Sequence, residues 1–301
     1  MRCGTVAEPT PALPERIAII GLGLIGGSVA RGLRARGHEG VLVGCVRTPA
    51  DADRALALGL VDEAGTDAAV AVAGADLVVV AVPIGAMADT LATIAPALAP
   101  AAAVTDVGST KLSVIAEARA GLGERFARFV PGHPIAGTEH SGLEAGFAEL
   151  YAGRRVILTP TAETDADALA TVTGLWHGLG ARVTEMGAAH HDEVLAATSH
   201  LPHVLAFALV DSLARMAERT EIFDYAAGGF ADFTRIASSD PTLWSDIVGA
   251  NRDAILPVLS RYIGDLETLR AAIEQGERAP LMDCFGRAKQ ARDRFTAARG
   301  G

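Results

Sequence analysis

The chain has 301 residues, half of them apolar, a length that suggests two domains. Its net charge of -10 argues against a nucleic-acid or anionic-membrane partner, and we find no uncharged run that approaches the length of about 18 residues needed to span a bilayer. The cysteines, Cys3, Cys45 and Cys284, are odd in number and far apart, so they predict neither a disulfide framework nor a zinc site and fit a reducing cytoplasm.

Residues 1–14 contain charges and prolines but no apolar core of the signal-peptide kind, so they predict a flexible lead-in. From Arg16 onward, short apolar runs alternate with amphipathic stretches, which predicts parallel βαβ units in a doubly wound α/β sheet. The expected strands are Ile17–Ile20, Val41–Cys45, Leu77–Val82, Ala103–Asp106, Phe129–Val130, Val156–Leu158 and Arg182–Thr184. The helices expected between them are Gly26–Arg36, Asp51–Leu58, Ile84–Ala95, Lys111–Ala120 and Asp165–Leu179.

After about Met186 the strand patterns stop and long helical patterns follow. The expected helices are His190–Arg215, Trp244–Asn251, Asp253–Ala272 and Leu281–Ala298. We therefore predict a boundary near residue 187, with an α/β domain over 15–187 and an all-helical domain over 188–301.

A glycine-rich turn follows the first expected strand. Gly21, Gly23 and Gly26 form a G-x-G-x-x-G motif that ends a strand, opens a helix and begins the βαβ series. In that context the first glycine permits a tight turn, the second lets the backbone approach a pyrophosphate, and the third allows close packing of helix and strand. The helix N-terminus then offers free N–H groups to the phosphates. We therefore predict a Rossmann-type dinucleotide site; a glycine turn without a ligand is the alternative.

The residues that usually choose between NAD and NADP lie at the end of the second strand. An NAD enzyme normally has Asp or Glu there, but this chain has Arg47 and Thr48, which could hold a 2′-phosphate. This favours NADP. Alternatively, Arg47 only stacks on adenine and both cofactors are used.

Polar residues also gather in three segments where a core would not require them. Two follow strands, at 105–111 (Thr-Asp-Val-Gly-Ser-Thr-Lys) and 132–139 (Gly-His-Pro-Ile-Ala-Gly-Thr-Glu), and the second is expected to be a non-helical loop. The third lies on the helical side, at 199–203 (Ser-His-Leu-Pro-His) and 232–237 (Asp-Phe-Thr-Arg-Ile-Ala). Taken singly, a loop histidine is often structural, and a serine before a helix can be only a cap. The chain shows no metal site, because no carboxylate or cysteine cluster accompanies His200 and His203. His190 and His191 cannot both face one centre from a helix, and Asp192 is expected at a helix start.

Together with the glycine turn, these segments resemble the prephenate/arogenate dehydrogenase family, over at least residues 16–251. The resemblance implies oxidative decarboxylation of prephenate to 4-hydroxyphenylpyruvate in tyrosine biosynthesis. In that reaction a hydride leaves C4 for NAD(P), a base takes the hydroxyl proton, and the ring carboxylate departs as CO2.

The resemblance also implies roles for single residues. His133 matches the catalytic histidine, and Ser109 matches a serine that bonds near the C4 hydroxyl and helps fix that histidine. Arg235 matches an arginine that binds a substrate carboxylate. Further residues are expected at the two sites: His203, His200, Thr138 and Trp244 for the substrate, and Leu24, Ile25, Val82 and Pro83 for the cofactor.

Several alternatives remain open. Arogenate, with an amine in place of the side-chain keto group, is the second candidate substrate, and Glu139 or Glu144 would favour it. A β-hydroxyacid dehydrogenase or imine reductase is less consistent, because the hydroxyacid enzymes use a lysine early in the helical domain and Lys289 is the only lysine after Lys111. A non-catalytic dinucleotide sensor would not need His133, Ser109 and Arg235.

The resemblance further implies a cytoplasmic homodimer formed through the helical domain. The apolar sets in Ala196–Leu213 and Ile255–Leu269 are broad enough for dimer helices, although monomeric cores have such faces too. The length leaves no room for an added regulatory domain, so any feedback by tyrosine is expected at the active site. In a rate assay, unchanged activity at millimolar tyrosine would reject that hypothesis.

Overall fold

The computed structural model describes residues 13–138, 140–216 and 223–299, apart from the side chains of 298 and 299. Backbone contacts divide the chain into two units, residues 1–252 and 253–301, and each is described by itself. Most of the expected flexible lead-in, 1–14, lies outside the described residues.

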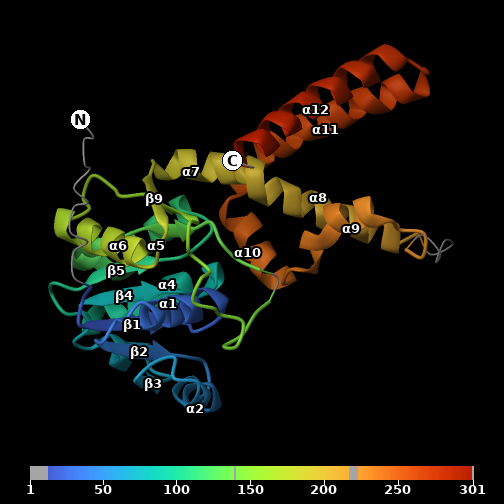
Figure 1. The fold of residues 1–301 in the computed structure, drawn as a ribbon. Coiled ribbons are helices and arrows are strands. Elements are labelled where there is room, and N and C mark those ends of the chain that lie inside the picture. Colours follow the sequence, from blue (N-terminus) through green and yellow to red (C-terminus); the bar gives the residue numbers. More distant parts are fainter. Residues whose placement is uncertain (1–12, 139, 217–222, 300–301) are drawn as a thin grey trace, which may run out of the picture. The chain divides into compact units, whose positions relative to one another are not determined.

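A six-stranded parallel sheet forms the centre of the first unit (Figure 1). Its strands are β1 (Arg16–Ile20), β2 (Val41–Cys45), β3 (Glu63–Gly65), β4 (Leu77–Val80), β5 (Ala103–Asp106) and β6 (Phe129–Val130). They lie in the order β3-β2-β1-β4-β5-β6, and every pair is parallel. The strand order reverses between β1 and β4, and ligands of such sheets bind at the carboxyl ends beside that point. The predicted doubly wound α/β fold is confirmed.

Helices cover both faces of this sheet because its strands are apolar on both sides. They are α1 (Leu24–Ala35), α2 (Pro49–Ala57), α3 (Ala68–Val72), α4 (Met87–Ile94), α5 (Leu112–Leu122) and α6 (Ala166–Gly178). Successive residues of β1 point to opposite faces: Ile17 and Ile19 pack into the core with α1 and α6, and Ala18 and Ile20 into the core with α3, α4 and α5.

A second, three-stranded sheet follows, with the order β7-β8-β9. Its strands are β7 (Gly132–Pro134), β8 (Arg155–Leu158) and β9 (Arg182–Glu185). β7 pairs antiparallel with β8, which pairs parallel with β9. The strands expected near 156–158 and 182–184 therefore do not extend the parallel sheet, and the expected loop at Gly132 begins as an edge strand, where a proline is tolerated because it need not donate to a neighbour.

Helices make up the rest of the first unit: α7 (Ala188–Leu195), α8 (Leu201–Ala214), α9 (Gly228–Thr234) and α10 (Pro241–Ala250). A wide π-helical turn, Ala196–His200, joins α7 to α8. By length and composition the stretch Ala188–Ala214 could cross a membrane, which corrects our expectation that no apolar run approaches that length. A single such helix is weak evidence for a membrane protein, because helices of soluble proteins pass the same test.

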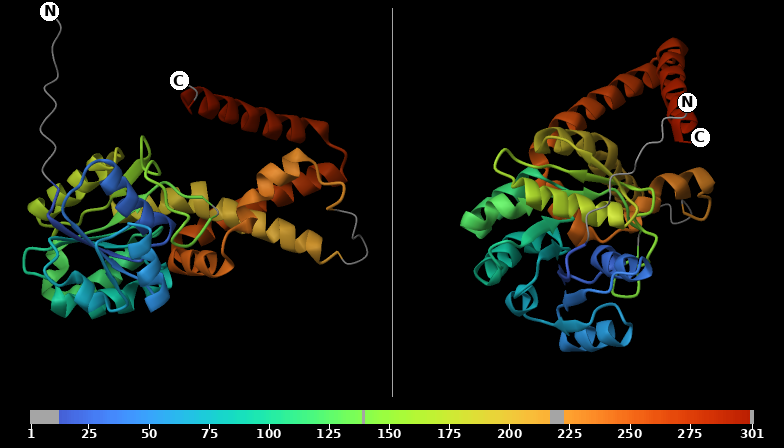
Figure 2. Two further views of the ribbon diagram at one scale, coloured as in Figure 1. Left: turned by 60° about the horizontal axis from the view of Figure 1, so that its bottom comes forward. Right: turned by 60° about the vertical axis from the view of Figure 1, so that its left-hand side comes forward.

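The second unit is a helical hairpin of α11 (Arg252–Glu274) and α12 (Arg278–Arg299). The two helices diverge from their connecting turn (Figure 2). Both carry large apolar side chains that stay exposed in the single chain: Leu256, Ile263, Leu266 and Ile273 on α11, and Met282, Phe285 and Phe295 on α12.

Candidate active site

The glycine turn after β1 has a geometry that only glycine satisfies at two positions. Gly21 has a φ of 94°, and a Cβ there would lie 2.4 Å from the carbonyl oxygen of Ala81. A Cβ on Gly26 would lie 1.9 Å from the carbonyl oxygen of Gly21. The first glycine therefore sets the turn, and the third lets α1 pack closely against the sheet.

The second glycine of the motif borders open space instead. No atom lies within 4 Å of a Cβ placed on Gly23. Gly23 precedes α1, no side chain caps this helix end, and its first turn has no acidic residue. The N–H groups of Leu24, Ile25 and Gly26 have no partner one turn earlier within the helix. This uncapped helix end beside an open glycine fits the pyrophosphate of a dinucleotide.

Arg47 and Thr48, the two residues expected to contact the cofactor's ribose, differ in their contacts. Arg47 is exposed and forms no hydrogen bond or ion pair within the described part of the chain. The Thr48 hydroxyl accepts from the Asp51 N–H (3.1 Å) and donates to the Asp51 carboxylate (2.7 Å), so it caps α2. Only Arg47 is therefore free to bind a 2′-phosphate.

Close contacts connect this turn to the polar segments across the carboxyl edge of the sheet. The loop after β4 begins with Ala81, which touches Gly21, and continues through half-buried Val82 and exposed Pro83. A Cβ on Gly108 would meet Ile84, from the same loop, at 2.7 Å, and one on Gly132 would meet the Asp106 carbonyl at 2.9 Å. The glycine turn and the segment that contains His133 thus lie along the same edge of the parallel sheet, at the carboxyl ends of its strands.

A buried ion pair supports the strand that carries His133. Lys111 and Asp106 are both fully buried and form a salt bridge. The Lys111 ammonium also donates to the Gly132 carbonyl at 2.7 Å, and the Asp106 carboxylate accepts from the N–H groups of Gly108 (2.7 Å) and Gly132 (3.0 Å). Burial lowers the pKa of Lys111, and Asp106 opposes that shift. The pair fixes Gly132, the neighbour of the candidate base.

His133 begins a chain of buried hydrogen bonds. Its Nδ1 lies 2.9 Å from Nε2 of His191, and Nδ1 of His191 lies 2.8 Å from the Asp192 carboxylate. That carboxylate also accepts from the N–H groups of Lys111 (2.8 Å) and Leu112 (2.9 Å), the start of α5. Asp192 therefore lies inside α7 and caps α5; our expectation that it starts a helix is wrong, because its partners come from another element.

Burial holds the pKa of His133 well below its usual value, and repulsion from His191, Lys111 and His200 adds to this. Hydrogen bonds from His191, Leu112 and Lys111 lower the pKa of Asp192 although its burial acts in the opposite direction. Near neutral pH the chain therefore joins an uncharged His133 to an ionised Asp192.

His200 is linked to Asp192 through Asn251. It is fully buried, its Nδ1 is 2.9 Å from the Asn251 side-chain nitrogen, and Asn251 also donates to the Asp192 carbonyl at 3.0 Å. Burial lowers the pKa of His200 to about 4, so it is neutral at physiological pH. Its Nε2 has no partner among the described residues.

The helical side also presents a stacked pair. The ring of His203 lies flat on Trp244, with centroids 3.4 Å apart, and its Nδ1 is 2.9 Å from the Ser199 carbonyl. Arg235 is exposed near it: burial lowers the pKa of His203, and the Arg235 charge lowers it further. His203 and Trp244 are thus in contact, and Arg235 lies close enough for its charge to act on His203.

Ser109 and Thr138 are held less firmly. Ser109 is half-buried, does not cap α5, and makes no hydrogen bond to His133. Thr138 is exposed, and its hydroxyl accepts a long bond of 3.3 Å from the His140 N–H. In the described residues, the contact that fixes His133 comes from His191.

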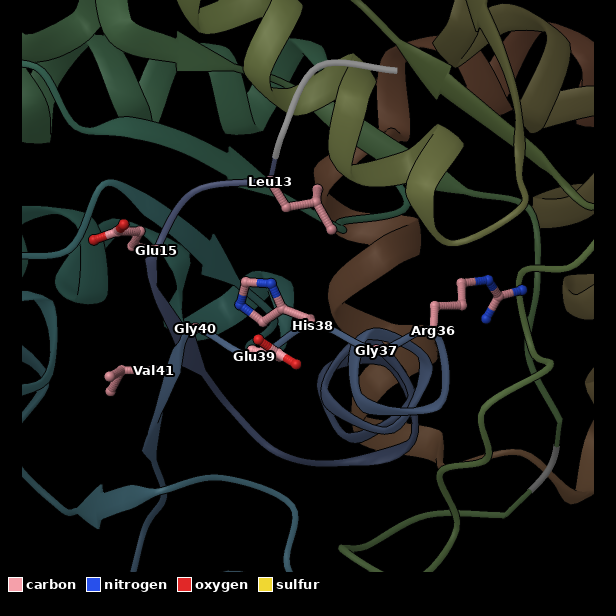
Figure 3. Close-up of a pocket in the computed structure, with 8 residues that line it drawn as sticks. All are labelled: Leu13, Glu15, Arg36, Gly37, His38, Glu39, Gly40 and Val41. Atoms are coloured by element: carbon pink, nitrogen blue, oxygen red, sulfur yellow. The ribbon is translucent and has the colours of Figure 1, made fainter. Parts of the chain in front are cut away.

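An open hollow of about 620 Å³ lies elsewhere, at the amino ends of β1 and β2 (Figure 3). Its lining comes from the lead into β1 and the turn between α1 and β2, and includes Glu15, Arg36 and His38. It is at the opposite edge of the sheet from the glycine turn and is not part of this site.

Two family models match the chain in succession. The nucleotide-binding domain of prephenate dehydrogenase matches residues 29–185, and the prephenate dehydrogenase dimerization domain matches residues 187–287. The chain belongs to the prephenate dehydrogenase family.

Individual proteins agree with this membership. The cyclohexadienyl dehydrogenase of Zymomonas mobilis is 44% identical over 92% of this chain and 95% of its own length. The crystal structure of prephenate dehydrogenase from A. aeolicus, in complex with hydroxyphenyl propionate and NAD+, is 36% identical and covers 93% of this chain and 98% of its own, with a TM-score of 0.87. Synechocystis arogenate dehydrogenase is 31% identical, covers 93% and 99%, and has a TM-score of 0.77.

The chain belongs to the prephenate dehydrogenase family and has a glycine turn shaped for a dinucleotide, so it is an NAD(P)-dependent oxidoreductase. Its cofactor is a nicotinamide dinucleotide, and its C-terminal part is the family's dimerization domain.

Sequence reasoning missed the residues behind His133. Adjacency led us to set His190 and His191 aside together, although one is exposed and the other buried. The sequence does contain a signal: the polar residues His191 and Asp192 share a helix face with the apolar Leu195 and Ala196. The structure buries all four. A polar pair on such a face requires buried partners.

Proposed function

We propose that this chain converts prephenate to 4-hydroxyphenylpyruvate, CO2 and NAD(P)H, as a cytoplasmic step of tyrosine synthesis. The observation that carries the proposal is the hydrogen-bonded His133, which lies along the sheet edge that begins at the dinucleotide turn. A neutral imidazole there can take a hydroxyl proton next to a hydride acceptor.

The cofactor, when bound, accepts the hydride from C4 of the substrate. His133 orients the C4 hydroxyl and accepts its proton while the C4–O bond becomes a carbonyl. The bond from the ring to its carboxylate then breaks, its electron pair aromatises the ring, and the resulting phenolate takes a proton. The proton lost to His133 and the proton gained by the product balance, so no metal or covalent nucleophile is required.

A charged group on the helical side is suited to a carboxylate of the substrate. Arg235 offers a planar pair of donors, and its neighbour His203 is held by Trp244 and the Ser199 carbonyl. We assign Arg235 to a carboxylate and His203, with Trp244 and Thr138, to the lining of the substrate site; Ser109 would lie next to the reacting hydroxyl.

Arogenate is the second candidate substrate, because a family member of similar fold is named an arogenate dehydrogenase and another a cyclohexadienyl dehydrogenase. Of the two carboxylates that could favour its amine, Glu144 is bound to Arg54 of α2 (3.0 Å), and Glu139 lies outside the described residues. With Glu144 already paired, prephenate is the substrate we favour.

We further propose NADP as the preferred cofactor. No carboxylate occupies 46–48, and Arg47 is exposed and unpaired there, whereas the structure from A. aeolicus was obtained with NAD+.

A homodimer formed through the C-terminal helices is also proposed. The exposed apolar side chains of the second unit and the apolar, little-buried stretch Ala188–Ala214 both need cover, and the matching family domain is described as a dimerization domain. Light scattering on the purified chain would give twice the chain mass; a monomer at micromolar concentration would contradict the proposal.

Absorbance at 340 nm in four parallel assays tests the reaction, crossing prephenate and arogenate with NAD+ and NADP+. We expect prephenate with NADP+ to react fastest. Faster turnover of arogenate or with NAD+ would reverse the corresponding preference, and four flat traces from a folded, cofactor-binding protein would reject the activity.

A further inference from the structure

The hydrogen-bond chain behind His133 fixes where its proton lies. We propose that His191 and Asp192 are positioning residues that hold neutral His133 in the tautomer protonated at Nδ1, so that Nε2 faces the substrate as a free acceptor. The inference deepens the proposed reaction and rests on it for the role of Nε2, but the proton assignment itself depends only on the contacts of this chain.

The assignment starts at the carboxylate. Asp192 accepts two backbone N–H groups, from Lys111 at 2.8 Å and Leu112 at 2.9 Å, and these donors cannot reverse their role. An ionised carboxylate is an acceptor only, so the ring nitrogen of His191 that lies 2.8 Å from it must carry a proton.

The same logic passes to the next ring. A neutral His191 protonated at Nδ1 has only an acceptor at Nε2. The atom 2.9 Å from that acceptor is Nδ1 of His133, which must therefore donate. The remaining nitrogen of His133, Nε2, is then unprotonated, and it makes no hydrogen bond within the described residues.

The charges around this chain favour the arrangement. The nearby cation, Lys111, is already neutralised by Asp106, and His200, which accepts from Asn251, is uncharged at neutral pH. Asp192 is thus the anion available to balance a positive His133. When Nε2 takes the hydroxyl proton, Nδ1 keeps its own proton and its bond to His191, so the buried imidazolium forms with its counter-charge already oriented.

Asp192→Ala is the decisive change. His191 and the Lys111 N–H bind the same carboxylate oxygen, Oδ1, whereas the Leu112 N–H binds Oδ2, so an asparagine could keep the bond to His191 with its amide oxygen. An alanine leaves Nδ1 of His191 without its acceptor, so neither ring is held in its tautomer and Nε2 of His133 can carry the proton. Loss of the correct tautomer in hydrogen-bonded catalytic chains reduces kcat by as much as about 10⁴-fold.

The direct measurement is 15N NMR of histidine-labelled protein without substrate at neutral pH, with the His133 signals assigned by their loss in His133→Asn. In the wild-type protein we expect a protonated Nδ1 and an unprotonated Nε2, and in Asp192→Ala a loss of that preference, with a proton appearing on Nε2. A wild-type His133 protonated at Nε2 overturns the proposal, and so does a His133 that stays fully protonated at Nδ1 in Asp192→Ala. Because this readout requires no turnover, it can succeed even if the proposed reaction fails.

Asp165→Ala is the matched control. Asp165 also caps a helix, α6, by accepting two backbone N–H groups at 2.8 and 3.2 Å, but no histidine is bound to it. We expect this variant to keep the wild-type His133 tautomer and kcat, which separates loss of a cap from loss of the proton chain.

Kinetics with two His191 variants complete the test. A glutamine amide reaches the position of Nε2 and can accept from His133, whereas an asparagine amide reaches only the position of Nδ1. We expect kcat to fall about 10-fold in His191→Gln and about 100-fold or more in His191→Asn, with KM and NADP+ affinity within about threefold of wild type. Equal kcat values in the two variants, or losses confined to KM, would contradict a positioning role.

Discussion

The two sides of the candidate active site differ in how firmly their polar groups are held. On the sheet side, Lys111, Asp106, His133, His191 and Asp192 are all buried, and each has at least one hydrogen bond to another element. On the helical side, Arg235 is exposed and His203 is half-buried against Trp244. The sheet side is therefore preorganised for the proposed proton transfer, whereas the helical side is more open to solvent.

The largest effect is expected from the preorganised side. His133→Asn retains a hydrogen-bonding group but removes the base, so kcat should fall by about two to four orders of magnitude with cofactor affinity kept. Steady-state rates and a fluorescence titration of NADP+ would measure both. A loss of only twofold would contradict the assignment of His133 as base.

Lys111→Met should destabilise the fold more than any change on the exposed side. The buried Asp106 carboxylate would lose its cation, and such losses cost about 3–5 kcal/mol. Urea unfolding measures this difference. Lys289→Met is the control, because the exposed pair Lys289–Asp293 (2.6 Å) should contribute little. Similar midpoints for the two variants would show that the buried pair is not a structural support.

Arg235→Gln should act on the proposed substrate binding alone. Losing a charge-assisted hydrogen bond of about 1.5–3 kcal/mol should raise KM for prephenate by roughly 10- to 100-fold. We expect kcat to change by less than about threefold if Arg235 holds the substrate equally in the ground and transition states. Arg215→Gln, which removes an exposed arginine paired with Asp211 on α8, should leave KM unchanged. An unchanged KM in Arg235→Gln would mean that another group binds the carboxylate.

The smallest effect is a shift of the pH profile. The base must be unprotonated, and the pKa of buried His133 lies well below 6.5. Activity is therefore retained as the pH falls through 6.5 and is lost only at lower pH. The profile of kcat/KM reports groups of the free enzyme and should stay flat from pH 8 to 6.5. An acidic midpoint at or above 6.5 would show that His133 is more hydrated than its burial implies.

Sequence patterns predicted the parallel sheet well because its strands are apolar and evenly spaced. β2, β5 and β6 have the expected bounds, and β1 and β4 differ at one end. β3 was missed because Glu63–Gly65 is short and lacks β-branched residues, and β7 because Gly132 and Pro134 are typical of loops. Periodicity also cannot show which sheet a strand joins, so the separate sheet of β7, β8 and β9 was not foreseen.

The candidate site was predicted as far as its motifs extend. The motifs contain His133, Arg235 and His203, but the contacts that orient His133 come from α7, in no recognised motif. The hydrogen bond between His133 and His191 joins residues 58 apart in sequence, and local patterns carry no information on such pairs.

The π-helical turn at Ala196–His200 sets which face of α8 carries His203. Regular α-helical spacing from Asp192 and Leu195 would put Ser199 at the middle of the inward face, yet His200 is the fully buried residue. The wide turn thus accommodates one residue more than regular spacing allows, and His200 takes the inward position that an unbroken helix would give to Ser199. Deleting a single residue from 196–199 would therefore leave His200, His203 and the apolar side of α8 facing as they do, whereas closing the turn into a regular helix without a deletion would rotate them by about 100° and turn His203 away from Trp244. The width of this one turn therefore sets both the direction of His203 and the direction of the apolar side of α8.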